Sequence, residues 1–237
     1  MQLVRFILFV SALMLGCLPA FASGTSQNRS EQAARARLDD ALAKKGLSFG
    51  SSVYVRVFKE EAELEVWLQN GDRYERFKTY PICALSGALG PKVKEGDGQS
   101  PEGFYGFTRA KLNPASQYHM AFDIGYPNAF DRSLGRTGSL IMVHGKCVSI
   151  GCFAMTDDGI EEIYSLASAA FAKQQASIAV HVFPFRMTTE NTKRHASSTW
   201  AEFWSDLKNG YDAFESTRVP PEVSFERGRY LVRTTKS

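Results

Sequence analysis

The chain has 237 residues, 44% of them hydrophobic and 22% charged, which is enough to bury the core of one sizeable domain. Its 28 Lys and Arg side chains nearly balance 25 Asp and Glu side chains, so the formal net charge is only +3. Because no dense basic patch accompanies this small excess, the composition argues against a nucleic-acid-binding protein.

The N-terminal residues predict export. Arg5 precedes an apolar run over residues 6–18, and an Ala-Phe-Ala triplet places small residues at the −3 and −1 positions before Ser23. This arrangement is typical of a cleavable secretory signal over residues 1–22. The run is shorter than the roughly 20 residues of a comfortable membrane span. We therefore expect a periplasmic protein with no stable membrane span, with a retained anchor or a lipoprotein acylated at Cys17 as the alternatives.

The first half of the remaining chain changes from helical to strand periodicity. We expect residues 23–30 to lie outside regular structure and an alanine-rich helix to follow over about 31–45. Alternating apolar residues then predict three strands joined in part by a hairpin at Asn70-Gly71. These strands are expected over 53–58, 64–68 and 74–83.

The second half mixes short strands with two longer helices. Glycine and proline predict loops over 87–103 and 125–138, and a capping box from Asp158 to Glu161 predicts a helix to about 174. Aromatic residues at helical spacing predict another helix over 200–214, packed on the core. Strands are expected over 104–107, 118–124, 139–143, 178–183 and 230–233. The outline is an α+β fold, mainly β with helices, whose sheet is mostly antiparallel.

One segment carries the residue types of nucleophilic catalysis. The apolar strand 139–143 ends in His144, and a loop punctuated by Gly145 and Gly151 leads to Cys152. Glycines allow the bends that bring a base within hydrogen-bond reach of a nucleophile. A free thiol is only about 3% thiolate at neutral pH, so we expect His144 to lower the pKa of Cys152. Backbone N–H groups at Gly151 and Cys152 are expected to stabilise an oxyanion.

The cysteine count leaves a thiol over. Cys83, Cys147 and Cys152 remain beyond the signal segment, so an oxidising compartment implies one disulfide and a spare thiol, or three thiols kept reduced. A Cys83–Cys147 pair leaves Cys152 free, whereas a Cys147–Cys152 pair inactivates it. Zinc held by His144 and the cysteines is a rival interpretation, but the spacing is unusual for zinc. An inert buried Cys152 is a further alternative. We expect neither metal nor cofactor.

These residues resemble a known family. His144-Gly145 followed by Ser149-x-Gly151-Cys152 is similar to the signature of the L,D-transpeptidase (YkuD-type) catalytic domain, in particular its YafK-like branch. The Ser-Pro-Glu-Gly run at 100–103 resembles the family's Thr/Ser-Pro-x-Gly strand start, and the likeness extends over about 52–188.

The resemblance implies a fold and a chemistry. It implies a single catalytic domain over 23–237, with a β-sandwich or barrel-like core over about 52–188, flanking helices and a helical extension over 189–237. Cys152 is implied as nucleophile and His144 as base, with the imidazole oriented by the Gly145 carbonyl or by Ser149. The implied substrate is the peptidoglycan stem peptide, attacked at the L-centre of diaminopimelate.

Two departures leave the acceptor open. The family often has His before Gly-Cys and Arg two residues after Cys, where this chain has Ile150 and Ala154. Without the arginine the site lacks a fixed positive charge for a substrate carboxylate. The resemblance therefore allows transfer to an amine, or an amidase that uses water to release an outer-membrane lipoprotein joined to diaminopimelate. A third hypothesis is an envelope-binding module with a structural cysteine or metal cluster.

Three further polar residues are candidates for substrate contact. Arg109, Tyr126 and Arg186 lie near expected loop ends, where binding residues concentrate. Each of these side chains also has a plain alternative as part of the scaffold or the solvated surface.

Overall fold

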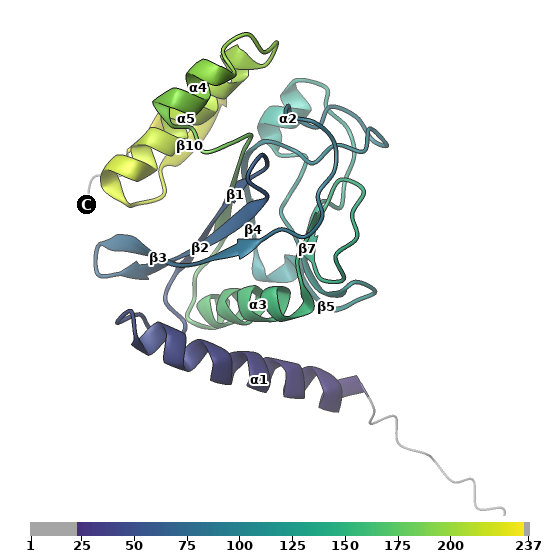
Figure 1. Ribbon diagram of the computed structural model, residues 1–237, viewed down its shortest axis with the longest axis vertical. Coiled ribbons are helices and arrows are strands. Elements are labelled where there is room, and N and C mark those ends of the chain that lie inside the picture. Colours follow the sequence, from purple (N-terminus) through teal and green to yellow (C-terminus); the bar gives the residue numbers. More distant parts are fainter. Residues whose placement is uncertain (1–22, 235–237) are drawn as a thin grey trace, which may run out of the picture.

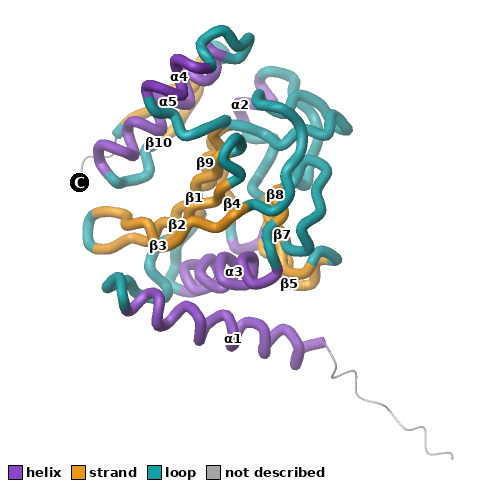
Figure 2. The backbone as a smooth tube through the Cα atoms, viewed as in Figure 1, coloured by secondary structure: helices purple, strands orange, loops and turns teal. Residues whose placement is uncertain are grey.

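The computed structural model describes residues 23–234 and contains two mixed sheets flanked by helices (Figures 1 and 2). The larger sheet has the strand order β3-β2-β1-β9-β4, with parallel pairing only between β1 and β9. Its strands are β1 (Val53–Phe58), β2 (Glu63–Asn70), β3 (Arg73–Pro81), β4 (Gly103–Phe107) and β9 (Ile178–Phe183).

The smaller sheet carries the His144 segment. Its order is β5-β6-β7-β8, and the pair β7/β8 is parallel while the other pairs are antiparallel. Its strands are β5 (Leu112–Ser116), β6 (His119–Asp123), β7 (Met142–His144) and β8 (Phe153–Ala154). A separate hairpin near the C-terminus joins β10 (Glu222–Glu226) and β11 (Arg229–Arg233).

Helices cover both faces of the larger sheet (Figure 1). They are α1 (Ser23–Ala43), α2 (Ala129–Ser133), α3 (Asp157–Ala172), α4 (Thr189–Arg194) and α5 (Ala201–Thr217), with a 3-10 turn at Arg109–Lys111. Along β1 the residues alternate, so Val55 joins the cluster that includes α3 while Tyr54 packs with Phe214 of α5. Ala34, Leu38 and Leu42 recur every four residues on α1 and are buried. In the described part of the chain, no helix is long and apolar enough to cross a membrane.

The predicted α+β class is confirmed, and the strands at 53–58 and 178–183 match residue for residue. The hairpin at Asn70-Gly71 is also present, because Asn70 pairs with Arg73. The expected signal segment, residues 1–22, lies outside the described residues.

Several boundaries differ from the predictions. Residues 23–30 belong to α1. The N-cap of α3 is Thr156, whose hydroxyl accepts from the Gly159 N–H, and it lies two residues before Asp158, the predicted cap. The expected strand over 139–143 is shorter, because Leu140 has φ +57° and extended pairing begins at Met142. Residues 230–233 pair with β10, a strand that the sequence did not predict, rather than closing the edge of a larger sheet. Helix α2 and strand β5 were also missed.

Candidate active site

Neighbouring parallel strands place His144 and Cys152 in the same part of the smaller sheet. His144 ends β7 and pairs with Ala154 of β8, and Val143 pairs with Phe153. Cys152 immediately precedes β8, and its sulfur accepts from the Met142 N–H at 3.4 Å. The free thiol therefore lies against the strand whose last residue is the histidine.

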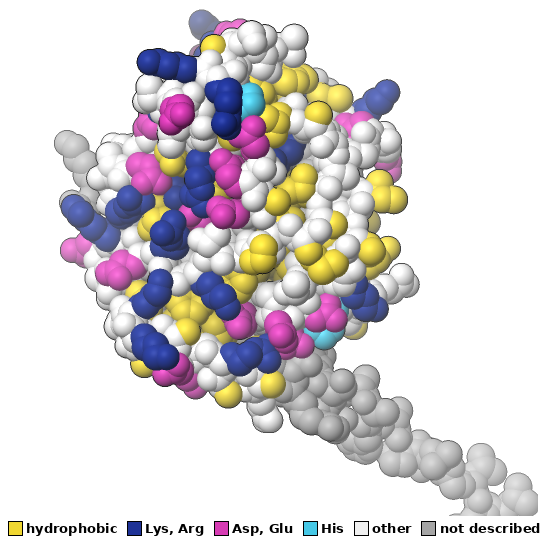
Figure 3. Space-filling view, in the orientation of Figure 1, with side chains coloured by type: hydrophobic (Ala, Val, Ile, Leu, Met, Phe, Trp, Pro, Cys, Tyr) yellow, Lys and Arg dark blue, Asp and Glu magenta, His cyan; other side chains and the backbone are white. Residues whose placement is uncertain are grey.

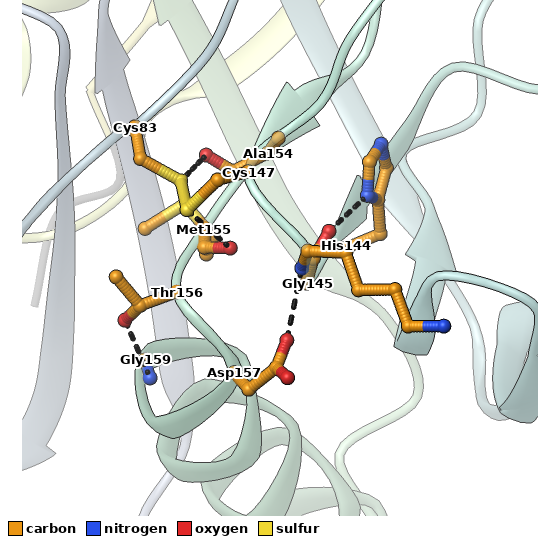
Figure 4. Close-up of a disulfide and its surroundings, with 10 residues drawn as sticks. Cys83, His144, Gly145, Cys147, Ala154, Met155, Thr156, Asp157 and Gly159 are labelled. Atoms are coloured by element: carbon orange, nitrogen blue, oxygen red, sulfur yellow. Dashed lines mark hydrogen bonds between the residues drawn. A yellow bond between two sulfur atoms is a disulfide. The ribbon is translucent and has the colours of Figure 1, made fainter.

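The imidazole of His144 is held by its neighbour. Nδ1 lies 2.7 Å from the carbonyl oxygen of Gly145, and the side chain is buried (Figure 4). A carbonyl can only accept, so Nδ1 carries the hydrogen and the neutral ring keeps its lone pair on Nε2. The ring of the half-exposed Tyr118 packs against the imidazole, with 4.9 Å between centroids. This environment leaves one ring nitrogen available as a base.

The sulfur of Cys152 is partly buried and uncharged at rest. Burial raises the pKa of the thiol and the nearby Asp123 adds to this, which outweighs the opposing effects of the Met142 N–H and of Lys92. The sequence led us to expect a pKa lowered by His144, and the structure gives the opposite direction. The thiol is therefore protonated near neutral pH.

Hydrogen bonds fix the loop that presents Cys152. Ser149 Oγ donates to the Cys152 carbonyl at 2.7 Å, and the Gly151 N–H donates to Ser86 Oγ at 2.6 Å. Gly151 has φ +102°, a conformation that side chains rarely adopt. Of the two groups expected to orient His144, the Gly145 carbonyl bonds the ring, whereas Ser149 bonds the backbone of Cys152. Since Ser86 occupies the Gly151 N–H, the Cys152 N–H is the better candidate for an oxyanion donor.

The start of the loop is anchored to α3 and to Cys83, two residues beyond β3 (Figure 4). Asp157 accepts from the Lys146 N–H at 2.9 Å, and a Cβ added at Gly145 would stand 2.5 Å from the same carboxylate oxygen. Cys147 forms a disulfide with Cys83, which leaves Cys152 as the free cysteine of the described residues. The glycine after His144 is thus required by close packing, and the turn cannot drift from the sheet.

A buried charge cluster, which the sequence analysis missed, supports the loop over 86–103 that lies next to Cys152. Lys59 Nζ donates to the carbonyls of Ala88, Gly90 and Ser100 and lies 3.0 Å from Glu102. The other oxygen of Glu102 accepts from Trp204 of α5 at 2.7 Å. Ser100 Oγ in turn lies 3.5 Å from the Cys152 carbonyl. The glutamate of the Ser-Pro-Glu-Gly run, Glu102, was the available sequence signal for this cluster. The structure shows that Glu102 is fully buried and therefore needs a partner.

The three candidates for substrate contact lie apart from these bonds. Tyr126 is buried, with its hydroxyl within 3.2 Å of the Lys92 and Thr137 carbonyls. Arg186 pairs with Glu63 and Glu65 of β2. Arg109 is exposed in the 3-10 turn. The structure thus ties Tyr126 and Arg186 into the scaffold and does not bring the three together.

Comparison with known families decides the assignment. A family model described as YkuD, the L,D-transpeptidase catalytic domain, matches residues 52–181, which is more than half of the chain. The chain belongs to the L,D-transpeptidase family. The candidate L,D-transpeptidase YafK of Escherichia coli strain K12 is 50% identical over 183 residues, covering 77% of this chain and 74% of YafK.

Solved structures add more distant likenesses. A mutant of the helical cell shape determining protein Pgp2 from Campylobacter jejuni is 24% identical with a TM-score of 0.46, covering 75% of this chain and 63% of that one. Bd1075 of Bdellovibrio bacteriovorus is 21% identical with a TM-score of 0.40, covering 70% of this chain and 57% of that one. Both likenesses are too loose to support an inference about activity.

The departures from the L,D-transpeptidase signature change the surface beside the thiol. Ala154 is fully buried, and its backbone bonds Ala84 across a bridge, so a charged side chain at this position would be buried as well. Ile150 is 88% exposed, and Val148 and Leu140 are also exposed. Ile150, where the family often has histidine, thus presents an exposed apolar side chain two residues before Cys152.

Metal chemistry finds no support in the donor set. Within residues 23–234, no three His, Cys, Asp or Glu side chains are grouped as metal ligands. Two of the three cysteines in the zinc interpretation are joined to each other, so their sulfurs are not thiolates.

Proposed function

We propose that this L,D-transpeptidase-family chain is a periplasmic cysteine acyltransferase that acts on peptidoglycan stem peptides, with Cys152 as nucleophile and His144 as base. The observation that carries the proposal is the bond from His144 Nδ1 to the Gly145 carbonyl. It leaves Nε2 as a proton acceptor on the strand that the free thiol touches. Family membership supports the substrate class.

The protonated thiol of Cys152 defines how the first step proceeds. As the sulfur attacks the amide carbonyl at the L-centre of diaminopimelate, His144 Nε2 takes the thiol proton and a C–S bond forms. The carbonyl oxygen becomes an oxyanion, for which the Cys152 N–H is a suitably placed donor. His144 then gives its proton to the departing amine as the C–N bond breaks, leaving a thioester on Cys152.

The second step divides two candidate functions. An acceptor amine would attack the thioester and form a new peptide bond, whereas water would release a free carboxylate. Ala154 and Ile150 stand where the family often has arginine and histidine, and neither side chain offers a charge to an acceptor's carboxylate, which favours keeping the hydrolytic candidate. In that case the enzyme would be an amidase cleaving the bond between diaminopimelate and an outer-membrane lipoprotein.

Intact-protein mass spectrometry tests the shared intermediate. Purified protein is mixed with tetrapeptide muropeptides, quenched in acid and weighed, and the adduct is mapped by peptide sequencing. We expect a thioester on Cys152, none in Cys152→Ala, and a rate lowered by about 10² to 10⁴ in His144→Ala. Circular dichroism and the intact Cys83–Cys147 disulfide establish that each variant is folded.

Product analysis separates the alternatives. A new crosslink from tetrapeptide stems indicates transfer, and free lipoprotein with an intact C-terminal lysine indicates hydrolysis. If the protein binds sacculi without forming an adduct, and if Cys152→Ala binds them as well as wild type, the enzymatic proposal is refuted in favour of an envelope-binding module. Fractionation of cells expressing the chain with and without residues 1–22 tests the periplasmic location.

A further inference from the structure

A cavity whose lining does not include Cys152 lies between β3 and the C-terminal half of α5. Its volume is about 730 Å³, and Trp67, Tyr74 and Tyr211 contribute aromatic rings to its wall. Six cationic side chains line this basic groove: Lys45, Arg56, Arg73, Arg76, Arg186 and Arg218. In Figure 3 dark blue side chains gather over the part of the surface where Figure 1 places β3 and the end of α5.

Six cations line the groove against four carboxylates, of which Glu75 and Glu215 line it and Glu63 and Glu65 pair with Arg186, so two positive charges remain in excess. One carboxylate, Glu65, is shared by Arg56, Arg76 and Arg186, at 2.8, 3.1 and 2.9 Å. Glu215 is likewise shared, by Arg56 and Arg218 at 2.7 Å each.

Two cations at the mouth are left over. Lys45 and Arg73 are exposed, and neither forms an ion pair within residues 23–234. The ammonium of Lys45 bonds the Arg76 carbonyl at 3.0 Å. The groove therefore presents positive charge that the protein itself leaves uncompensated.

The groove is rigid before any ligand arrives. Arg56 is 2% exposed, and its guanidinium lies 4.8 Å from the ring centre of Trp67. Burial opposes ionisation of Glu65, but Arg56 and the hydrogen bonds of Trp67 and Arg186 prevail and lower its pKa to about 2. The carboxylate stays charged at any physiological pH, so the buried Arg56 guanidinium that it holds forms a fixed part of the groove wall.

Size and geometry point to a peptide with several carboxylates. A cavity of this volume suits a ligand far larger than one inorganic ion. Guanidinium groups match carboxylates in shape and charge, and Arg56 already directs two nitrogens at one oxygen of Glu65. The groove also borders β3, the outer strand of its sheet, where the Tyr74 N–H already bonds the backbone carbonyl of Arg218 at 2.7 Å. Because this donor is already occupied, an extended peptide in the groove would lie against the aromatic wall and not pair with Tyr74.

We propose that the basic groove is a binding site for an acidic peptide segment, separate from the thiol site. The guanidinium and ammonium groups of Arg73 and Lys45 would bind the peptide's carboxylates, and the aromatic wall would cover its backbone. The site does not depend on the chemistry proposed for Cys152, because the two share no lining residue.

Titration calorimetry at low ionic strength tests the site on the full protein. The probes are acetylated pentaglutamate, pentaglutamine as the neutral match, and tripolyphosphate as a phosphate oligoanion. We expect pentaglutamate to bind and pentaglutamine not to bind. Lys45→Ala combined with Arg73→Ala should weaken binding at least about tenfold, because two charge-assisted contacts are lost. Both side chains are exposed, so the double variant should fold normally.

The matched control is Arg227→Ala, which removes a cation that is 90% exposed and lies outside the groove. It should leave the affinity within about twofold, since a distant exposed charge is screened. Alkylation of Cys152 should also leave the affinity unchanged. Equal weakening in Arg227→Ala, loss of binding on alkylation, or absence of pentaglutamate binding would each overturn the proposal. Tripolyphosphate binding tighter than pentaglutamate would overturn the assignment to a peptide.

Discussion

The disulfide between Cys83 and Cys147 should contribute a large share of the stability. It closes a loop with a sequence separation of 64 residues. The chain-entropy relation for a loop of that length gives about 4 kcal/mol at 25 °C. Domains are typically stable by only about 5 to 15 kcal/mol, so replacing both cysteines with alanine should bring the fold close to its limit.

Equilibrium unfolding in urea, followed by tryptophan fluorescence without reductant, measures this contribution. With an m-value of about 2 kcal/mol/M, the double variant should unfold at a midpoint lower by about 2 M. The control is Cys152→Ala, which leaves the loop closed and should shift the midpoint by less than about 0.5 M. Equal midpoints for the double variant and the control would refute the reasoning, because loop closure would then contribute nothing.

Three more outcomes are expected. Glu65, whose pKa is lowered from 4.5 to about 2, should stabilise the fold above pH 4.5 and lose this effect as the pH falls towards 2. The difference in free energy of unfolding between wild type and Glu65→Gln should therefore shrink by on the order of 3 kcal/mol over that range, as measured by urea unfolding at each pH. A difference that stays constant with pH would contradict this prediction. The apparent pKa for alkylation of Cys152 by iodoacetamide should be higher than that of a free cysteine peptide measured alongside, since burial raises the thiol pKa. A rate that has already reached its plateau near neutral pH would instead reveal a preformed ion pair. Lys59→Met should cost about 3–5 kcal/mol in urea unfolding because it leaves Glu102 buried and unpaired, and adding Glu102→Gln should recover part of the loss; additive losses would show that the two are not coupled.

The strand periodicity of this chain was sufficient to predict most of the larger sheet. Residues 53–58 and 178–183 alternate strongly, and the turn at Asn70-Gly71 allows one tight geometry. The helix at 129–133 was hidden because it is short and depends on Asn128, which forms a capping box with Asp131. Such a local exchange of bonds leaves little trace in periodicity.

The candidate site was predictable to the extent that it lies in one segment. His144, Gly145 and Cys152 are close in sequence, so their spacing carried the signal. The direction of the thiol pKa was missed, because it depends on burial and on Asp123 of another strand, which spacing does not report. Ser86 and Lys59 were missed for the same reason, since their partners are 65 and 43 residues away.

The indole of Trp204 bonds Glu102, the carboxylate that helps to hold the loop next to Cys152. A protein shortened to the segment that the family model matches, residues 52–181, would lose that indole and open the sealed side of Glu102 to water. Loss of activity on such trimming would then say nothing about where substrates dock. Helix α5 packs behind the loop next to Cys152, and any shortened form of this enzyme therefore has to include it.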